Sequence, residues 1–134
     1  METATTSFEL SVVIPAPPER VYAALTDPKQ HAAFTGAPAA GKPVPGGRFT
    51  AWDGYIEGSY LELEPPVRIV QEWSTTEWPE GAPPSRVEFQ LKGVPEGTEL
   101  RLLHTDVPAE QAESYRQGWV DYYWHPLRRF FHGG

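Results

Sequence analysis

The 134-residue sequence contains no cysteine, which excludes disulfides, thiolate nucleophiles and cysteine-ligated zinc. Basic residues are also scarce: Lys and Arg number 11 against 18 Asp and Glu, and the net charge is −7. A nucleic-acid-binding domain needs a broad basic face, whereas the longest basic run here is Arg128-Arg129. We therefore expect no nucleic acid among the partners.

Long apolar segments are missing as well. No run of about 18 apolar residues is present, so the sequence predicts no membrane-spanning helix. The first residues, Met1-Glu2-Thr3-Ala4, lack the basic and apolar regions of a signal peptide. Together these absences predict a cytoplasmic protein.

Catalytic motifs are absent too. There is no Gly-x-Ser-x-Gly elbow, no glycine-rich phosphate or dinucleotide loop and no His-Glu-x-x-His. His104 and Asp106 are two residues apart, but no third group at metal-ligand spacing accompanies them. We expect a protein that is not an enzyme and that carries no metal and no cofactor.

What the sequence does contain is one domain, 1–134, rich in aromatic residues. Phe8, Leu10, Val12 and Ile14 alternate with other residues, which predicts a half-buried strand. A helix is expected from Pro17-Pro18 to Thr26, and a second one over 28–34 with Asp27 as its cap. Further strands are expected over 46–52, 55–64, 67–75 and 86–92, and around Leu100, Leu102 and His104. Asp53-Gly54 is typical of a two-residue hairpin turn and Gly58 of a bulge.

Aromatic residues recur at helical spacing between Ala109 and Phe131, and Pro126 is expected to kink that helix. Short sequential strands with tight turns favour an antiparallel meander with one wet face. The other face needs a cover, and the long terminal helix is the simplest one. The predicted fold is α+β: a curved antiparallel sheet wrapped around a long C-terminal helix, with two short helices after the first strand. Bulky aromatics against a curved sheet pack imperfectly, which predicts a cavity between them.

Several sequence blocks, in order, resemble a known family from about Phe8 to Phe131. The chain is similar to the START-like helix-grip superfamily. Within it, the chain resembles the C-terminal domain of activators of the 90-kilodalton heat-shock-protein ATPase and their bacterial single-domain homologues. The blocks that carry the resemblance are Ala33-Phe34-Thr35-Gly36-Ala37-Pro38, Gly46-Gly47-Arg48-Phe49, Leu63-Glu64-Pro65-Pro66, Trp78-Pro79-Glu80-Gly81, Gly97-Thr98-Glu99-Leu100, Arg116-Gln117-Gly118-Trp119 and Tyr122-Tyr123.

The resemblance implies a helix-grip fold and a non-enzymatic, cochaperone-like function with a heat-shock chaperone as partner. Eukaryotic activators carry a separate N-terminal domain, and we expect this chain to lack it. The alternative function is that of a binder or carrier of a small apolar ligand in the helix–sheet cavity. We expect a monomer or a homodimer.

Candidate site residues follow from the predicted fold and its cavity. Trp78, in a loop, is a candidate partner-binding anchor, or it folds back over the core. His104 is either a cavity-lining group or a core histidine with satisfied hydrogen bonds, and an enzyme using it with a tyrosine as acid and base is a third interpretation. Tyr122 is expected in the core. The candidate cavity-lining residues are Tyr60, Gln71, Trp73, Phe89, Leu102, His104, Trp119 and Tyr123.

Overall fold

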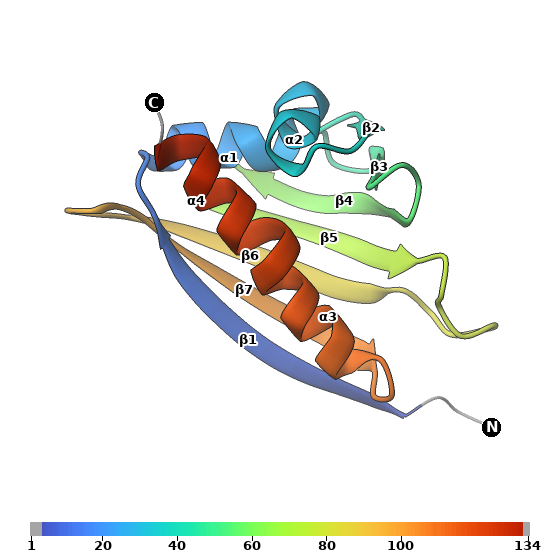
Figure 1. Ribbon diagram of the computed structural model, residues 1–134. Helices are drawn as coiled ribbons and strands as arrows, with labels where there is room; N and C mark the ends of the chain where they lie inside the picture. Colours follow the sequence, from blue (N-terminus) through green and yellow to red (C-terminus); the bar gives the residue numbers. More distant parts are fainter. Residues whose placement is uncertain (1–3, 133–134) are drawn as a thin grey trace.

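The computed structural model describes residues 4–132, and its seven strands form one antiparallel sheet. The strands lie in the order β1-β7-β6-β5-β4-β3-β2 (Figure 1), so the first and the last strands of the chain are neighbours. Their bounds are β1 Thr5–Ile14, β2 Ala40–Gly41, β3 Arg48–Ala51, β4 Ile56–Glu64, β5 Arg68–Thr75, β6 Ser85–Val94 and β7 Gly97–Pro108.

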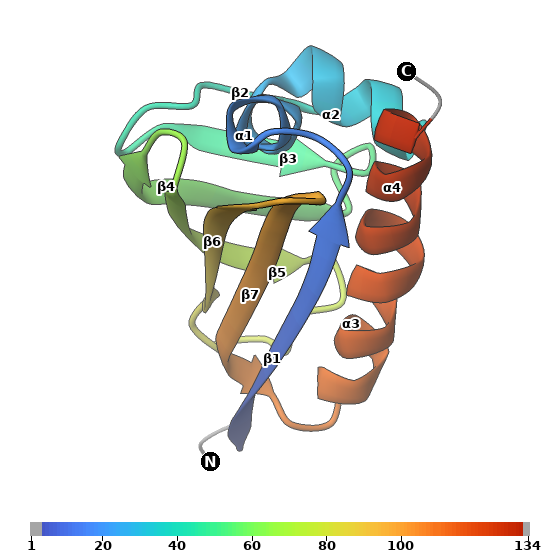
Figure 2. The ribbon, with the colours of Figure 1, turned by 90° about the vertical axis from the view of Figure 1, so that its left-hand side faces the viewer.

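The helical segments cover one face and one end of this sheet. Figure 2 shows two short helices across one end and the C-terminal helix along the concave face, which confirms the predicted fold class. Within residues 4–132, no helix has both the length and the apolar character needed to cross a membrane. The bounds are α1 Pro18–Thr26, α2 Pro28–Thr35, α3 Ala112–Trp119, a π-helical turn η1 Val120–Trp124 and α4 His125–His132.

Alternation along the central strands determines which side chains face the helix. On β6, Val87, Phe89 and Leu91 are buried while the residues between them are more exposed. On β7, Leu100 and Leu102 are fully buried, as their parity predicts. The expected inward face of the sheet is therefore confirmed at both strands.

The corner between β1 and α1 forms as the sequence predicts. α1 begins at a proline, where a missing N–H costs no hydrogen bond. The side chain of Asp27 caps α2, since its Oδ1 accepts a hydrogen bond from the backbone N–H of Lys29 at 3.0 Å. This confirms the predicted cap.

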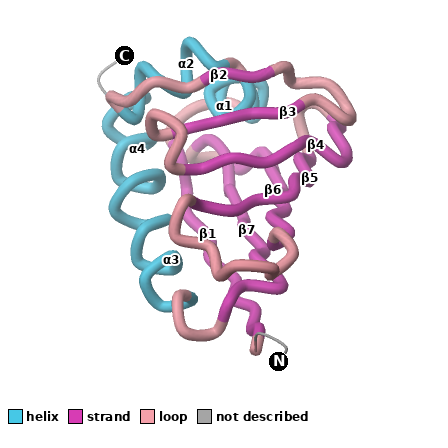
Figure 3. Tube along the Cα trace, turned by 90° about the vertical axis from the view of Figure 1, so that its right-hand side faces the viewer, coloured by secondary structure: helices cyan, strands magenta, loops and turns pink. Residues whose placement is uncertain are grey.

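The C-terminal helix differs from the sequence prediction in two ways. It begins at Ala112 rather than at Ala109, after a turn that follows β7. Instead of a simple kink at Pro126, it contains η1, in which the His125 N–H donates to the Val120 carbonyl five residues back. The irregularity that Pro126 imposes is therefore a wider turn directly before it, and the helix continues along the sheet (Figure 3).

Two turn predictions were wrong. The hairpin between β3 and β4 pairs Ala51 with Ile56, so its loop has four residues, Trp52–Tyr55, rather than two. The backbone has positive φ at Trp52 and at Asp53, 53° and 57°, which lets the longer loop reverse the chain. The bulge of β4 lies between Tyr60 and Glu62, not at Gly58.

Gly58 instead marks a close approach of two strands. A Cβ at this position would overlap the backbone carbonyl of Glu72 and lie 2.9 Å from the Phe49 ring. We expect Gly58→Ala to lower the free energy of unfolding by about 1–3 kcal/mol, as overpacked sites do. Urea unfolding measures this change. Ser59→Ala, one residue along the same strand, is the matched control, and an equal loss in both variants would contradict the explanation.

Candidate functional site

A groove of about 510 Å³ lies between the C-terminal helix and the neighbouring part of the sheet. The loop before β4 and the start of that strand form one wall, and the helix forms the other. Most of the side chains that line it are aromatic. The lining residues are Trp52, Tyr55, Ile56, Trp73, Ser114, Tyr115, Gly118, Trp119, Tyr122 and Tyr123.

The four-residue hairpin loop brings Trp52 to the groove. There its ring meets that of Tyr122 from the helix at 5.4 Å between centroids and 70° between planes. Tyr122 is 56% exposed, so its expected place in the core was wrong. The reason is the π-helical turn, which adds a residue to the helical repeat and moves Tyr122 from the buried stripe to the rim.

One end of the groove is polar. The hydroxyl groups of Tyr115 and Thr75 are 2.7 Å apart, and the Tyr115 hydroxyl also donates to the side-chain carbonyl of Gln111. Tyr55 donates to the carboxylate of Glu77 at 3.3 Å. Burial raises the pKa of Tyr115 to about 12, so this phenol keeps its proton at neutral pH.

Three of the predicted cavity residues, Trp73, Trp119 and Tyr123, line this groove. Trp73 projects from β5, and Trp119 and Tyr123 lie one helical turn apart on the facing helix. Their ring centroids are close, 5.6 Å for the pair Trp73–Trp119 and 4.7 Å for Trp119–Tyr123. These three side chains belong to the buried core and also form the floor of the groove.

Tyr60, Gln71 and Phe89 lie elsewhere, around a second space of about 30 Å³ beneath α1 and α2. A space of this size holds a water molecule or two rather than an organic ligand, since one water needs roughly 10–15 Å³ on this measure. Leu102 is fully buried and lines neither space.

His104 also lies in the core and lines neither space. Its Nδ1 accepts a hydrogen bond from the Trp119 indole N–H at 3.1 Å, so the proton of the neutral ring is on Nε2. Nε2 then donates to Ser85 Oγ at 2.8 Å, and Ser85 donates to the Trp73 carbonyl. Burial lowers the pKa of His104 to about 3, which keeps the ring neutral.

A second buried histidine, His31 on α2, was not among the residues predicted from the sequence. Its Nε2 is 2.9 Å from the Tyr123 hydroxyl, and burial lowers its pKa to about 4. Among the described residues, its Nδ1 is buried with no hydrogen-bond partner. The three-residue spacing from His31 to the buried Phe34 was the available signal that this ring faces inward.

Trp78, the candidate partner anchor, is half-buried at the end of the groove. Its ring stacks on Tyr115 at 5.9 Å and 29°, and it meets Trp73 edge to face at 5.9 Å. The indole N–H donates to the Pro83 carbonyl at 2.9 Å. One side of the ring thus packs against the protein, while part of its surface remains accessible.

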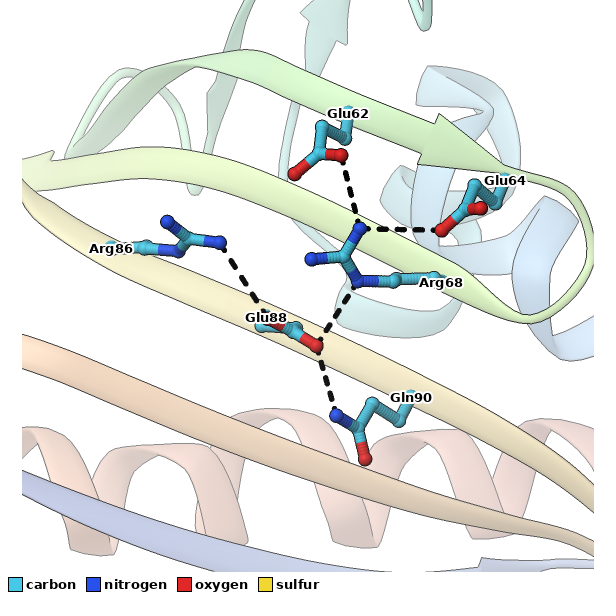
Figure 4. Close-up of polar contacts among 6 residues, drawn as sticks. All are labelled: Glu62, Glu64, Arg68, Arg86, Glu88 and Gln90. Atoms are coloured by element: carbon cyan, nitrogen blue, oxygen red, sulfur yellow. Dashed lines mark hydrogen bonds and ion pairs between the residues drawn. The ribbon is translucent and has the colours of Figure 1, made fainter.

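The outer face of the sheet is charged rather than apolar. Arg68 contacts three carboxylates, Glu62 at 3.1 Å, Glu64 at 3.2 Å and Glu88 at 3.1 Å (Figure 4). Glu62 points outward, as its parity predicts, and each of these carboxylates faces an arginine instead of a second carboxylate. This arrangement is a solvated sheet face rather than a general-acid pair. Across residues 4–132, no three His, Asp or Glu side chains gather where they could hold a metal ion.

The curved sheet, the helix it encloses and the groove between them define a helix-grip domain. The chain belongs to the family described as "Activator of Hsp90 ATPase homolog 1-like protein", whose model matches residues 15–132. The match covers both short helices, six strands and the terminal helix.

Curated relatives agree with this family assignment. The chain is 34% identical over 116 residues to the human "Activator of 90 kDa heat shock protein ATPase homolog 1", covering 85% of this chain and 33% of the human protein. It therefore spans about a third of the length of the curated relatives that it matches.

Solved structures show the same fold. An HSP90 activator from Plasmodium falciparum superimposes with a TM-score of 0.86 at 28% identity, over 92% of this chain and 94% of that chain. CalU16 from Micromonospora echinospora does so with a TM-score of 0.74 at 28% identity, over 92% and 76% of the two chains.

Proposed function

We propose that this chain is a cochaperone-type interaction domain that binds a 90-kilodalton heat-shock chaperone and changes its ATPase rate. The observation that carries the proposal is the similarity to the Plasmodium falciparum activator, because the aligned region covers 94% of that chain. The human relative, named as an activator of the same ATPase, supports it over a third of its length.

The domain itself is proposed to have no catalytic activity. His104, the histidine of the candidate acid–base pair with a tyrosine, makes two hydrogen bonds inside the core and lines neither space described above. A cytoplasmic location belongs to the same proposal, since a partner that hydrolyses ATP works where ATP is supplied. A monomer or a homodimer stays a prediction, which light scattering tests.

The direct test uses the heat-shock chaperone of the source organism. Titration calorimetry is expected to show binding at concentrations up to tens of micromolar, and a coupled assay is expected to show a changed ATPase rate. A specific inhibitor of the chaperone gives the background rate to subtract. If neither binding nor a rate change appears in this range, the proposal is wrong for this chain.

Trp78 is the proposed contact residue for that partner. Trp78→Ala is expected to weaken chaperone binding roughly tenfold or more, as the loss of an aromatic hot-spot residue does. The measurement is calorimetry on both proteins, with near-UV and far-UV circular dichroism to verify the fold. Val67→Ala, an exposed apolar residue in the turn before β5, is the control. An unchanged affinity in a folded Trp78→Ala protein would remove this residue from the interface.

The alternative function is that of a binder or carrier of a small apolar ligand, and the groove of about 510 Å³ favours it, since ligand sites commonly have about 300–1,000 Å³. Native mass spectrometry and a thermal-shift screen against lipids and aromatic compounds test this alternative. A mass shift or a raised midpoint that Tyr122→Ala abolishes would support it.

A further inference from the structure

The groove walls are aromatic rather than aliphatic. Of the residues that line it, seven are Trp or Tyr and Ile56 is the only aliphatic side chain. An aliphatic wall attracts any neutral apolar molecule. A ring also has a negative face, which attracts a cation within about 6 Å of its centre.

The rings are inclined to one another, Trp73 and Trp119 by 36°, Trp119 and Tyr123 by 49°, and two further pairs more steeply. Trp73 and Tyr115 are inclined by 84°, and Trp52 and Tyr122 by 70°. Rings in one plane would form a slot that fits a flat neutral molecule. Rings at right angles surround a compact group from several sides, which suits the tetrahedral shape of an alkylammonium group.

A negative charge contacts one of the residues that line the groove. Within residues 4–132, no Lys, Arg or His lines the groove. The Glu77 carboxylate lies at its polar end, where it accepts the hydrogen bond of Tyr55. In the sequence, Asp53 and Asp121 are neighbours of lining residues, and so is Arg116, which follows Tyr115. With a net charge of −7, the protein as a whole attracts cations.

We propose that the groove binds an organic ammonium cation with an apolar body, the ammonium group lying against the aromatic rings of Trp52 and Tyr122 at the mouth. This inference rests on the alternative function, ligand binding in the groove, and is independent of chaperone binding. The exposed ring of Tyr122 and the half-buried ring of Trp52 contact the ammonium group, and the apolar body of the ligand lies deeper along the groove.

The test compares two probes of the same shape and different charge. Benzyltrimethylammonium is the cation, and neopentylbenzene, in which carbon replaces nitrogen, is the neutral isostere. Three tryptophans line the groove, so tryptophan fluorescence reports binding of either probe. The cation is expected to bind at least about fivefold more tightly, a typical cation–π preference.

Variants of Tyr122 separate the attraction of the ring's negative face for a cation from the apolar contact that the side chain makes. Because the side chain is 56% exposed, substitution here is compatible with folding. Tyr122→Leu is expected to weaken binding of the cation about fivefold and to leave the isostere unchanged, whereas Tyr122→Phe retains both affinities. Glu77→Gln is expected to lower the preference for the cation. Phe130→Ala, an exposed aromatic site on the same helix but outside the groove, is the control.

Each result is decisive. Tighter binding of the cation that Tyr122→Leu abolishes supports the proposal. Equal or tighter binding of the isostere overturns it and leaves ligand binding by the groove intact. Failure of the cation to bind at millimolar concentration overturns the cation site, while the ligand screen described under the alternative function decides ligand binding by the groove separately.

Discussion

Trp119→Ala is expected to lower the free energy of unfolding by about 3–5 kcal/mol, the range for removal of a buried aromatic side chain. Trp119 is 3% exposed and touches three strands from the helix. Its ring contacts Trp73 on β5 at 5.6 Å and Phe89 on β6 at 5.7 Å, and its N–H donates to His104 on β7. The substitution therefore removes packing and leaves the Nδ1 of a buried histidine without its donor.

Urea unfolding followed by circular dichroism measures this loss. Trp119→Phe is expected to fall between the wild type and alanine, since phenylalanine restores part of the packing but not the hydrogen bond. Tyr122→Ala, on the exposed side of the same helix, is the control, with an expected loss below about 1 kcal/mol. A loss as small as this for Trp119→Ala would contradict the packing of helix against sheet described above.

Acidification is the second large effect, because two buried histidines must stay neutral in the folded protein. Burial lowers the pKa from 6.5 to about 3 for His104 and to about 4 for His31. In the unfolded chain both rings take up protons below pH 6.5, while in the folded protein they do not until near these lower values. The unfolded state therefore binds more protons in this window, and stability rises with pH.

Stability is thus complete above about pH 6.5 and is lost as the pH falls toward 4. Each histidine contributes about 1.4 kcal/mol per pH unit, so the pair is expected to cost roughly 2.7 kcal/mol for each unit below about pH 6. Urea unfolding at several pH values between 5 and 7 gives this slope. The range lies above the pH at which carboxylates usually titrate.

His104→Gln is the variant that isolates one of the two contributions. A glutamine amide can donate to Ser85 and accept from Trp119, and it does not titrate. The slope is expected to fall by about half, because His31 alone then remains. His125→Gln, on an exposed part of α4, is the control. A wild-type stability that does not change between pH 7 and pH 5 would show that these rings are not kept neutral by folding.

Much of the fold could be predicted from the sequence because strand alternation and helix caps depend on residues that are close together in the chain. The alternation of Val87, Phe89 and Leu91 defines the buried face of β6 within that strand alone, and the Asp27 cap depends only on the next two residues. The positions of Gly58 and Tyr122 depend on distant residues. Position 58 must be glycine because the carbonyl of Glu72, on the neighbouring strand, lies where a Cβ would be. Tyr122 lies at the rim because of the π-helical turn.

The groove was only partly predictable for the same reason. Trp73, Trp119 and Tyr123 follow from strand parity and helical spacing. Trp52 and Tyr55 lie in a loop, where no periodicity indicates which way a side chain points. The wall of the groove that this loop forms is therefore visible only in the structure. His104 had the correct inward direction, but parity alone does not distinguish the lining of a cavity from the solid core beneath it.

The two edges of the sheet have unequal lengths. β2 ends one edge with two residues, whereas β1 ends the other with ten, and β1 pairs with β7 alone. An edge strand offers its free N–H and C=O groups to another chain, and a two-residue edge offers too few to hold one. A second copy of the chain that added a strand to this sheet would therefore have to pair with β1. Glu9 lies on the outer face of β1, where it pairs with Arg101 of β7, and it places a charge where the added strand would align.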